Sequence, residues 1–289
     1  MRKRSYLIGA LTLAGVVAFA GVVTALAART GPNVPHIIGE LDKTKVPKKK
    51  YKKNGALFGT FETVPGCPEG PPTPPGCRVD PAKQVNFSFD KDIKFNPKTE
   101  PDQCDPAVLQ NQPLEAARQR CGDALVGEGE AGATVGDAAP VDLVADTLVF
   151  NGTPVGGKPG IVLYTRTRPP TPITTVLPAF ITKTPSGLVR RARRSGGTAT
   201  ASALKGGQTL FVTVPPLAGG VGSLTGFNAH VKHGKYITTR CKSKKKRWQF
   251  SAEFTYDTIP PGGGAAGPPE YSDTATTSQK CKPKKKKKK

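Results

Sequence analysis

The sequence predicts an all-β protein: an antiparallel β-sandwich or jelly roll with one or two short helices. Two observations concern composition. The chain has 29 prolines and 33 glycines in 289 residues, which disfavours long helices, and its short segments rich in Val, Thr, Leu and Phe end at Gly or Pro clusters. The third observation is a two-residue alternation in RWQFSAEFTY, typical of a strand with one buried and one solvated face. The residues on its apolar face are Trp248, Phe250, Ala252, Phe254 and Tyr256.

Residues 1–27 have the layout of a secretory signal peptide. A basic start at residues 2–4 precedes an uncharged stretch that ends in the small-residue cleavage site ALA at residues 25–27. The alternative is an uncleaved N-terminal anchor, because an uncharged stretch of about 20 residues is long enough to cross a bilayer. Both interpretations export everything that follows.

The exported part divides by composition into three segments. Residues 28–55 are short of apolar side chains and crowded with lysine, as in KTKVPKKKYKKNG, so we expect a basic disordered linker. The β-sandwich domain is expected over residues 56–259. Residues 260–289 read as a Gly/Pro loop and a lysine-rich tail, in which residues 270–279 either add an edge strand or stay irregular.

The domain is expected to begin with two strands, ALFGTFETV at residues 56–64 and KQVNFSF at residues 83–89. Two short helices follow. Asp105 can cap a turn opened by Pro106, and Pro113 can open a helix that Gly122 closes.

Beyond Gly122 the pattern predicts strands: DALVGEGEAGATV, DTLVFNG, GIVLYTRT, TTVLPAFITKT, GLVRRARR, QTLFVTV and GFNAHVKHG. We expect Lys242 to Arg247 to form the exposed tip of a hairpin that joins KYITTRC to RWQFSAEFTY.

The six cysteines are an even number, which in an exported protein indicates three disulfides. Fifteen pairings are possible, and the sequence alone does not choose among them. A zinc site needs close pairs such as C-x-x-C, and none occurs, so we expect no metal and no cofactor. Proximity favours Cys67 with Cys77, Cys104 with Cys121, and Cys241 with Cys281.

Two stretches carry a resemblance to known proteins: Cys104 through ARQRCGDALVGEGEA, and GSLTGFNAHVKHGKYITTRC followed by an alternating strand. They resemble a group of uncharacterised secreted β-rich proteins of soil actinobacteria. It covers most of the chain beyond residue 80 and carries no assigned activity. It implies export and an all-β fold with paired cysteines.

No catalytic motif stands out. The glycines of GEGEAG have the G-x-G-x-x-G spacing, but no helical pattern follows, as a dinucleotide site would require. The chain has no G-x-S-x-G motif, and His230 and His233 would point to opposite faces of a strand. We therefore expect a non-enzymatic protein. The alternative is a secreted carbohydrate-active hydrolase with a carboxylate pair, for which Asp90 with Asp92 or Glu128 with Glu130 are candidates.

The strongest non-random feature is positive charge: 43 Lys and Arg against 21 Asp and Glu, a formal net charge of +22. Aromatic residues are almost absent from the basic runs, which disfavours nucleic acid. We expect an anionic cell-wall polymer or lipid headgroups as partner. Extracellular DNA binding and merely solvated chain ends remain the alternatives. The candidate polyanion-binding residues are Lys48, Lys49, Lys50, Lys52, Lys53, Lys244, Lys245, Lys246, Arg247, Lys284, Lys285 and Lys286.

Overall fold

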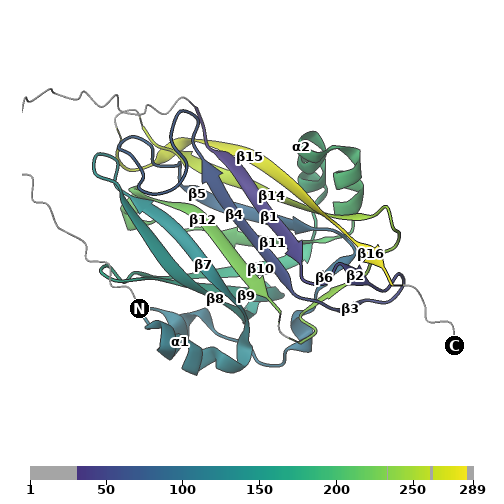
Figure 1. Cartoon of the computed structure of the whole chain (residues 1–289). Coiled ribbons are helices and arrows are strands. Elements are labelled where there is room, and N and C mark those ends of the chain that lie inside the picture. Colours follow the sequence, from purple (N-terminus) through teal and green to yellow (C-terminus); the bar gives the residue numbers. More distant parts are fainter. Residues whose placement is uncertain (1–30, 233, 261–262, 285–289) are drawn as a thin grey trace, which may run out of the picture.

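The computed structural model describes residues 31–232, 234–260 and 263–284, and its main element is one eleven-stranded antiparallel sheet (Figure 1). The predicted signal peptide and the predicted contacts of Lys285 and Lys286 lie outside the described residues. The strand order is β1-β4-β12-β7-β8-β9-β10-β11-β5-β14-β15. The bounds are β1 Val34–Leu41, β4 Ala56–Thr63, β5 Ala82–Phe89, β7 Leu125–Val135, β8 Val141–Val155, β9 Lys158–Thr167, β10 Thr174–Lys183, β11 Gln208–Thr213, β12 Gly222–Val231, β14 Arg247–Thr258 and β15 Gly267–Lys280.

The two end strands of this order, β1 and β15, come together, so the sheet is nearly closed. Side chains take the place of a backbone ladder at this seam. The Leu41 N–H donates to Oε1 of Gln279 over 2.9 Å, and Nε2 of Gln279 donates to the Leu41 carbonyl over 3.2 Å. The all-β prediction is confirmed. The architecture is one continuous antiparallel sheet that curls until its two end strands meet, so that it is nearly a barrel.

The interior is filled by the residues that the alternation in RWQFSAEFTY marked as apolar. All five side chains of that parity in β14 are at most 1 % exposed, and Phe250 contacts Phe89 edge to face, with ring centroids 6.4 Å apart. The opposite face of β14 was expected to be solvated, and this is wrong in part. Ser251 and Glu253 are also buried, because a helix covers them.

That helix, α2 (Ser186–Leu204), corrects the prediction of a strand in GLVRRARR. Leu, Arg and Ala are strong helix formers, and Leu188 and Ala192, four residues apart, are both buried on one face. Arg191 pairs with Glu253 of β14. A positive φ at Gly197 interrupts the helix, so its second half runs in a new direction.

The two predicted short helices are confirmed. Asp105 accepts a hydrogen bond from the Ala107 N–H, 2.9 Å away, at the start of the 3-10 helix η2 (Pro106–Leu109). The helix α1 (Leu114–Cys121) follows Pro113. Both lie in the loop closed by the disulfide Cys104–Cys121. The other 3-10 turns are η1 (Pro97–Thr99), η3 (Gly122–Ala124) and η4 (Ala218–Gly220).

The prediction of a disordered linker over residues 28–55 is wrong where the structure describes this segment. All eight residues of β1 pair with β4, from Val34 opposite Thr63 to Leu41 opposite Ala56. The apolar run VPHIIGEL precedes the lysines, and the high lysine content of the whole segment concealed it. At the other end of the chain, β15 is the edge strand that the sequence left open, and it pairs along β14.

Two small sheets lie at one end of the large one (Figure 1). The first has the order β3 (Lys52–Lys53), β13 (Ile237–Thr239) and β6 (Ile93–Phe95). The second pairs β2 (Lys45–Val46) in parallel with β16 (Lys282–Pro283). The expected hairpin from β13 to β14 is therefore wrong, since the partners of β13 are β3 and β6.

The packing of β1 over β14 generates a stability prediction. A Cβ added at Gly39 would clash with the ring of Phe250, so Gly39→Ala is expected to destabilise the fold by about 1–3 kcal/mol through overpacking. Gly122→Ala is the control, because a Cβ there meets nothing within 4 Å. Denaturant unfolding of both variants measures the difference. Equal stability of the two would show that β1 does not pack as described.

Candidate polyanion-binding surface

Three lysine-rich segments that are far apart in the sequence lie together at one end of the sheet. The N–H of Lys282 donates to the Thr44 carbonyl over 2.8 Å, and the N–H of Lys284 donates to the Val46 carbonyl over 2.9 Å. Lys52 and Lys53 pair with β13, which leads directly into the third segment. We call this surface the basic end, defined by residues 45–53, 240–247 and 282–284.

The disulfide Cys241–Cys281 lies at the centre of the basic end. Both cysteines are completely buried, with Cα atoms 5.9 Å apart. The Cys241 N–H donates to the Pro47 carbonyl over 3.0 Å, and the Cys281 N–H donates to the Lys246 carbonyl over 3.2 Å. The disulfide therefore joins the second and third segments covalently, and a backbone hydrogen bond from Cys241 attaches the first segment to it.

The disulfide pairing that proximity favoured is confirmed throughout. Cys67 is bonded to Cys77, Cys104 to Cys121 and Cys241 to Cys281, and no described cysteine is free. Three disulfides are typical of a protein that folds in an oxidising compartment.

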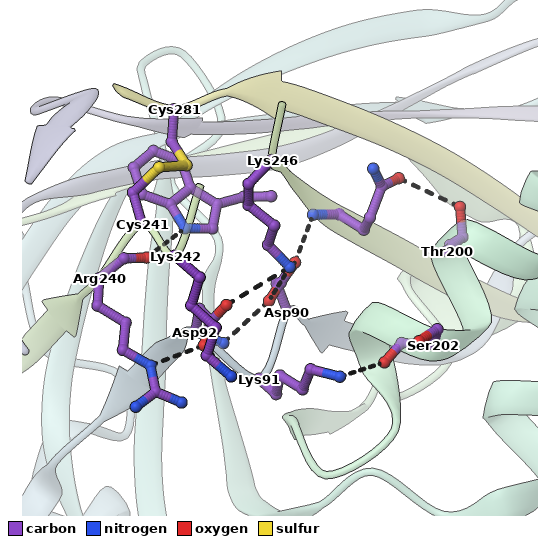
Figure 2. A network of polar contacts seen from close by, with 12 residues as sticks. Asp90, Lys91, Asp92, Thr200, Ser202, Arg240, Cys241, Lys242, Lys246 and Cys281 are labelled. Carbon is purple, nitrogen blue, oxygen red and sulfur yellow. Dashed lines mark hydrogen bonds and ion pairs between the residues drawn. A yellow bond between two sulfur atoms is a disulfide. The ribbon is translucent and has the colours of Figure 1, made fainter. Parts of the chain in front are cut away.

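Two buried carboxylates anchor the loop between β13 and β14 (Figure 2). Asp90 and Asp92 form the turn after β5 and have no solvent exposure. Nζ of Lys246 lies 2.8 Å from Oδ2 of Asp90, and Nε of Arg240 lies 2.8 Å from Oδ1 of Asp92. Lys242 adds a longer ion pair to Asp92, at 3.6 Å. Three cations of the basic end thus face two anions.

Burial dominates the electrostatics of this turn. It raises the pKa of Asp90, although the positive charge of Lys246 and its hydrogen bond act in the opposite direction. An ionised Asp90 is stabilised by the Lys246 cation and by hydrogen bonds from the N–H groups of Asp92 and Gln249, over 2.9 and 3.2 Å. The carboxylate pair Asp90 and Asp92, a candidate for hydrolysis on sequence grounds, is held in ion pairs inside the protein.

The other candidate pair is also engaged by arginines. Glu128 lies 2.5 Å from Arg118, and Glu130 lies 2.5 Å from Arg168. These ion pairs are exposed, and each acid has its own cation.

The second half of α2 contacts this turn and the neighbouring start of β14. Nζ of Lys91 donates to the Ser202 carbonyl over 2.8 Å, and the Thr200 hydroxyl donates to Oε1 of Gln249 over 3.1 Å. Both contacts are drawn in Figure 2. The helix that sequence reasoning missed therefore helps to fix the turn that holds Lys246 in place.

Tyr51, the aromatic residue inside the first lysine run, has its ring in contact with two cations of the same chain. Nζ of Lys94 and the guanidinium carbon of Arg240 each lie 4.5 Å from its ring centroid. Its hydroxyl donates to the Lys91 carbonyl over 2.9 Å. Cation–π contacts of this kind order the loop and place cations where a stacked base would otherwise approach.

Most of the predicted polyanion-binding residues are exposed at the basic end. Lys246 is the correction: its side chain is only 17 % exposed and neutralises Asp90, so it is not available to a partner. Three more exposed lysines, Lys45, Lys242 and Lys282, belong to the same basic runs but were not among the selected candidates. The predicted residues that remain exposed are Lys48, Lys49, Lys50, Lys52, Lys53, Lys244, Lys245, Arg247 and Lys284.

The two histidines that the structure describes make contacts other than metal ligation. His230 lies 2.8 Å from Asp42, His36 stacks on Phe61 with ring centroids 4.6 Å apart, and His233 lies outside the described residues. Within the described ranges, no group of three or more His, Cys, Asp or Glu side chains is arranged to hold a metal ion. Across the same residues, no helix has the length and apolar character needed to cross a membrane.

No family model matches this chain, and searches of curated proteins and of solved structures find no significant match.

The anchoring of Lys246 generates a pH-dependent prediction. Lys246→Met leaves Asp90 buried without its main cation, and we expect a loss of about 3 kcal/mol at neutral pH. Loss of the Lys246 cation raises the pKa of folded Asp90 further above the value in the unchanged protein, which burial already raises. The deficit is therefore full above the Asp90 pKa of the variant, and it shrinks as the pH falls from there towards the Asp90 pKa of the unchanged protein. Denaturant unfolding across this range measures it.

Lys245→Met is the matched control for that experiment. Lys245 is exposed and next in sequence, so its replacement should change stability by less than about 0.5 kcal/mol at any pH. A Lys246→Met deficit that stays constant with pH would contradict the assignment to Asp90.

The central disulfide generates a second stability prediction. The double variant Cys241→Ala and Cys281→Ala opens a loop with a sequence separation of 40. The chain-entropy model gives a loss of about 4 kcal/mol for such a loop. Limited proteolysis should then cleave the C-terminal segment near Lys282 before the rest of the domain unfolds. Unchanged protease resistance there would show that β2 holds β16 without the covalent bond.

Proposed function

We propose that this chain is a secreted or surface-associated, non-enzymatic β protein that binds an anionic polymer of the cell envelope at its basic end. One observation carries the proposal: three lysine-rich segments from distant parts of the sequence converge around Cys241–Cys281. Solvated chain ends need no common location. Convergence concentrates the positive potential over one surface, as recognition of a repeating polyanion requires.

Export is supported by the signal-like layout of residues 1–27 and by the three disulfides. The resemblance to secreted actinobacterial proteins agrees with it. A partner outside the cytoplasm with closely spaced negative charges is an anionic wall polymer or a surface of anionic lipid headgroups. The wall polymer is the better fit, because the lysines lie on short strands and loops without an exposed apolar face to enter a bilayer.

Binding of this kind is the sum of many weak contacts. Each exposed lysine keeps its ammonium group in water, and each contact is screened by salt over a Debye length of about 10 Å at moderate ionic strength. Affinity should therefore depend on the number of lysines and on their common location, and it should fall steeply with salt.

A charge-matched pair of variants tests the proposal. Lys48, Lys49 and Lys50 replaced by Gln removes three charges from the basic end, and Arg190, Arg193 and Arg194 replaced by Gln removes three exposed charges from α2. We expect the first variant to bind isolated anionic cell walls about tenfold more weakly and to elute at lower salt. The second should change little, since its net charge is the same but the basic end is intact.

Co-sedimentation with walls over a salt series provides the measurement. Equal weakening of both variants would mean that net charge alone drives retention, and the proposed site would be wrong. Stronger binding to anionic vesicles than to walls would assign the lipid surface instead, and release by duplex DNA at low concentration would assign DNA.

A further inference from the structure

A surface cleft lies at the end of β4 that is farther from the basic end. It is a cleft of about 550 Å³ between the outer face of β4, β12, β7 and β8 and the loop of residues 64–77, which the disulfide Cys67–Cys77 closes. The strand β4 runs from Ala56, beside the basic end, to Thr63 at this cleft.

The floor of the cleft follows from the strand register. Phe61 on β4 pairs with Gly226 on β12, Gly226 pairs with Gly132 on β7, and Gly132 pairs with Val144 on β8. These four residues share one face of the sheet. Two glycines thus separate two exposed apolar side chains, Phe61 at 42 % and Val144 at 48 % exposure. Three strand spacings place these walls about 14 Å apart.

Phe61 is an aromatic platform that is fixed in place. His36 stacks on it from the neighbouring strand with rings inclined by 10°. On its other side, Gly226 presents no side chain, so the ring is open towards the cleft. Exposed, immobilised aromatic rings of this kind offer a large apolar contact at low entropic cost.

The polar wall of the cleft is equally ordered. The Asp142 carboxylate accepts hydrogen bonds from the Thr73 N–H at 2.7 Å, and from the hydroxyls of Thr73 and Thr134 at 2.6 Å each. Partial burial favours the protonated form, but these hydrogen bonds outweigh it and lower the pKa of Asp142. Asp142 therefore stays ionised, with acceptor capacity that a hydroxyl donor can use.

The charge of the cleft is opposite to that of the chain. Its acidic lining residues are Glu62, Glu69 and Asp142, with no Lys or Arg among the residues that line it. Burial raises the pKa of Glu62 well above its usual range, so Glu62 is not counted as an anion here. In a protein with 43 basic residues against 21 acidic ones, this lining excludes a polyanion from the cleft. The ligand must combine an apolar face for Phe61 with hydroxyl donors for the carboxylate wall.

We propose that this cleft binds a neutral oligosaccharide. A sugar ring has an apolar C–H face that stacks on an aromatic ring and equatorial hydroxyls that donate to carboxylates, and it carries no charge for the acids to repel. Mixed lining with a few convergent polar groups is the pattern of small-ligand sites in general. The proposal does not rest on the function of the basic end, because the cleft and its residues are separate from it.

Isothermal titration of the full chain with three neutral sugars, cellohexaose, maltohexaose and fully N-acetylated chitohexaose, tests the site. We expect at least one of these to bind with an affinity that high salt leaves unchanged, because the ligand is neutral. Phe61→Ala should weaken binding about tenfold, and Val144→Lys should weaken it by placing a long side chain over the glycine floor.

Two controls accompany the titration. Phe61 and Val144 are both exposed, so circular dichroism should confirm that the two cleft variants fold. Ile173→Ala, which removes an apolar side chain of the same 42 % exposure outside the cleft, should bind like the unchanged protein. Absence of binding to all three sugars, or equal affinity of Phe61→Ala and Ile173→Ala, would overturn the proposal. Replacement of Lys48, Lys49 and Lys50 by Gln must leave sugar binding intact, or the binding belongs to the basic end.

Discussion

Electrostatic repulsion at the basic end is the constraint on which this structure is built. Two unit charges about 10 Å apart in water repel by about 0.4 kcal/mol, so a surface with many lysines opposes its own assembly. The fold offsets this repulsion with a covalent bond at Cys241–Cys281 and with two fully buried acids, Asp90 and Asp92. A disulfide is insensitive to salt and to charge. The basic end can therefore keep its geometry while most of its charges stay exposed.

The features that could be predicted from the sequence are those that a short stretch of chain determines by itself. The alternation of β14, the proline-initiated helices near Asp105 and Pro113, and the pairing of nearby cysteines all depend on short stretches of chain. The prediction failed where a long-range contact decides. A basic segment becomes α2 because its apolar side packs on β14, and Lys246 leaves the surface because Asp90 lies beneath it. No spacing in the sequence relates residue 90 to residue 246.

The saccharide cleft shows the same limit more strongly. Its floor exists because Gly226 and Gly132 are register partners across β12 and β7, and β12 reaches that position from almost a hundred residues later in the chain. The sequence marked Gly132 only as part of a G-x-G-x-x-G spacing. The physical role of this glycine is spatial, since a Cβ there would lie 2.8 Å from the hydroxyl oxygen of Thr225.

The seam between β1 and β15 links the two ends of the molecule. At one end, Gln279 bridges to Leu41 two residues before Cys281, so the central disulfide also closes the seam. At the other end, the Asn33 N–H donates to the Tyr271 hydroxyl over 3.0 Å, and that hydroxyl donates to Asp80 over 2.7 Å. Because contacts join β1 to β15 at both ends of the seam, these two end strands cannot separate easily. The basic end and the cleft are thus held at a fixed separation by β4, whose eight residues span about 24 Å, and one molecule can present both surfaces at once.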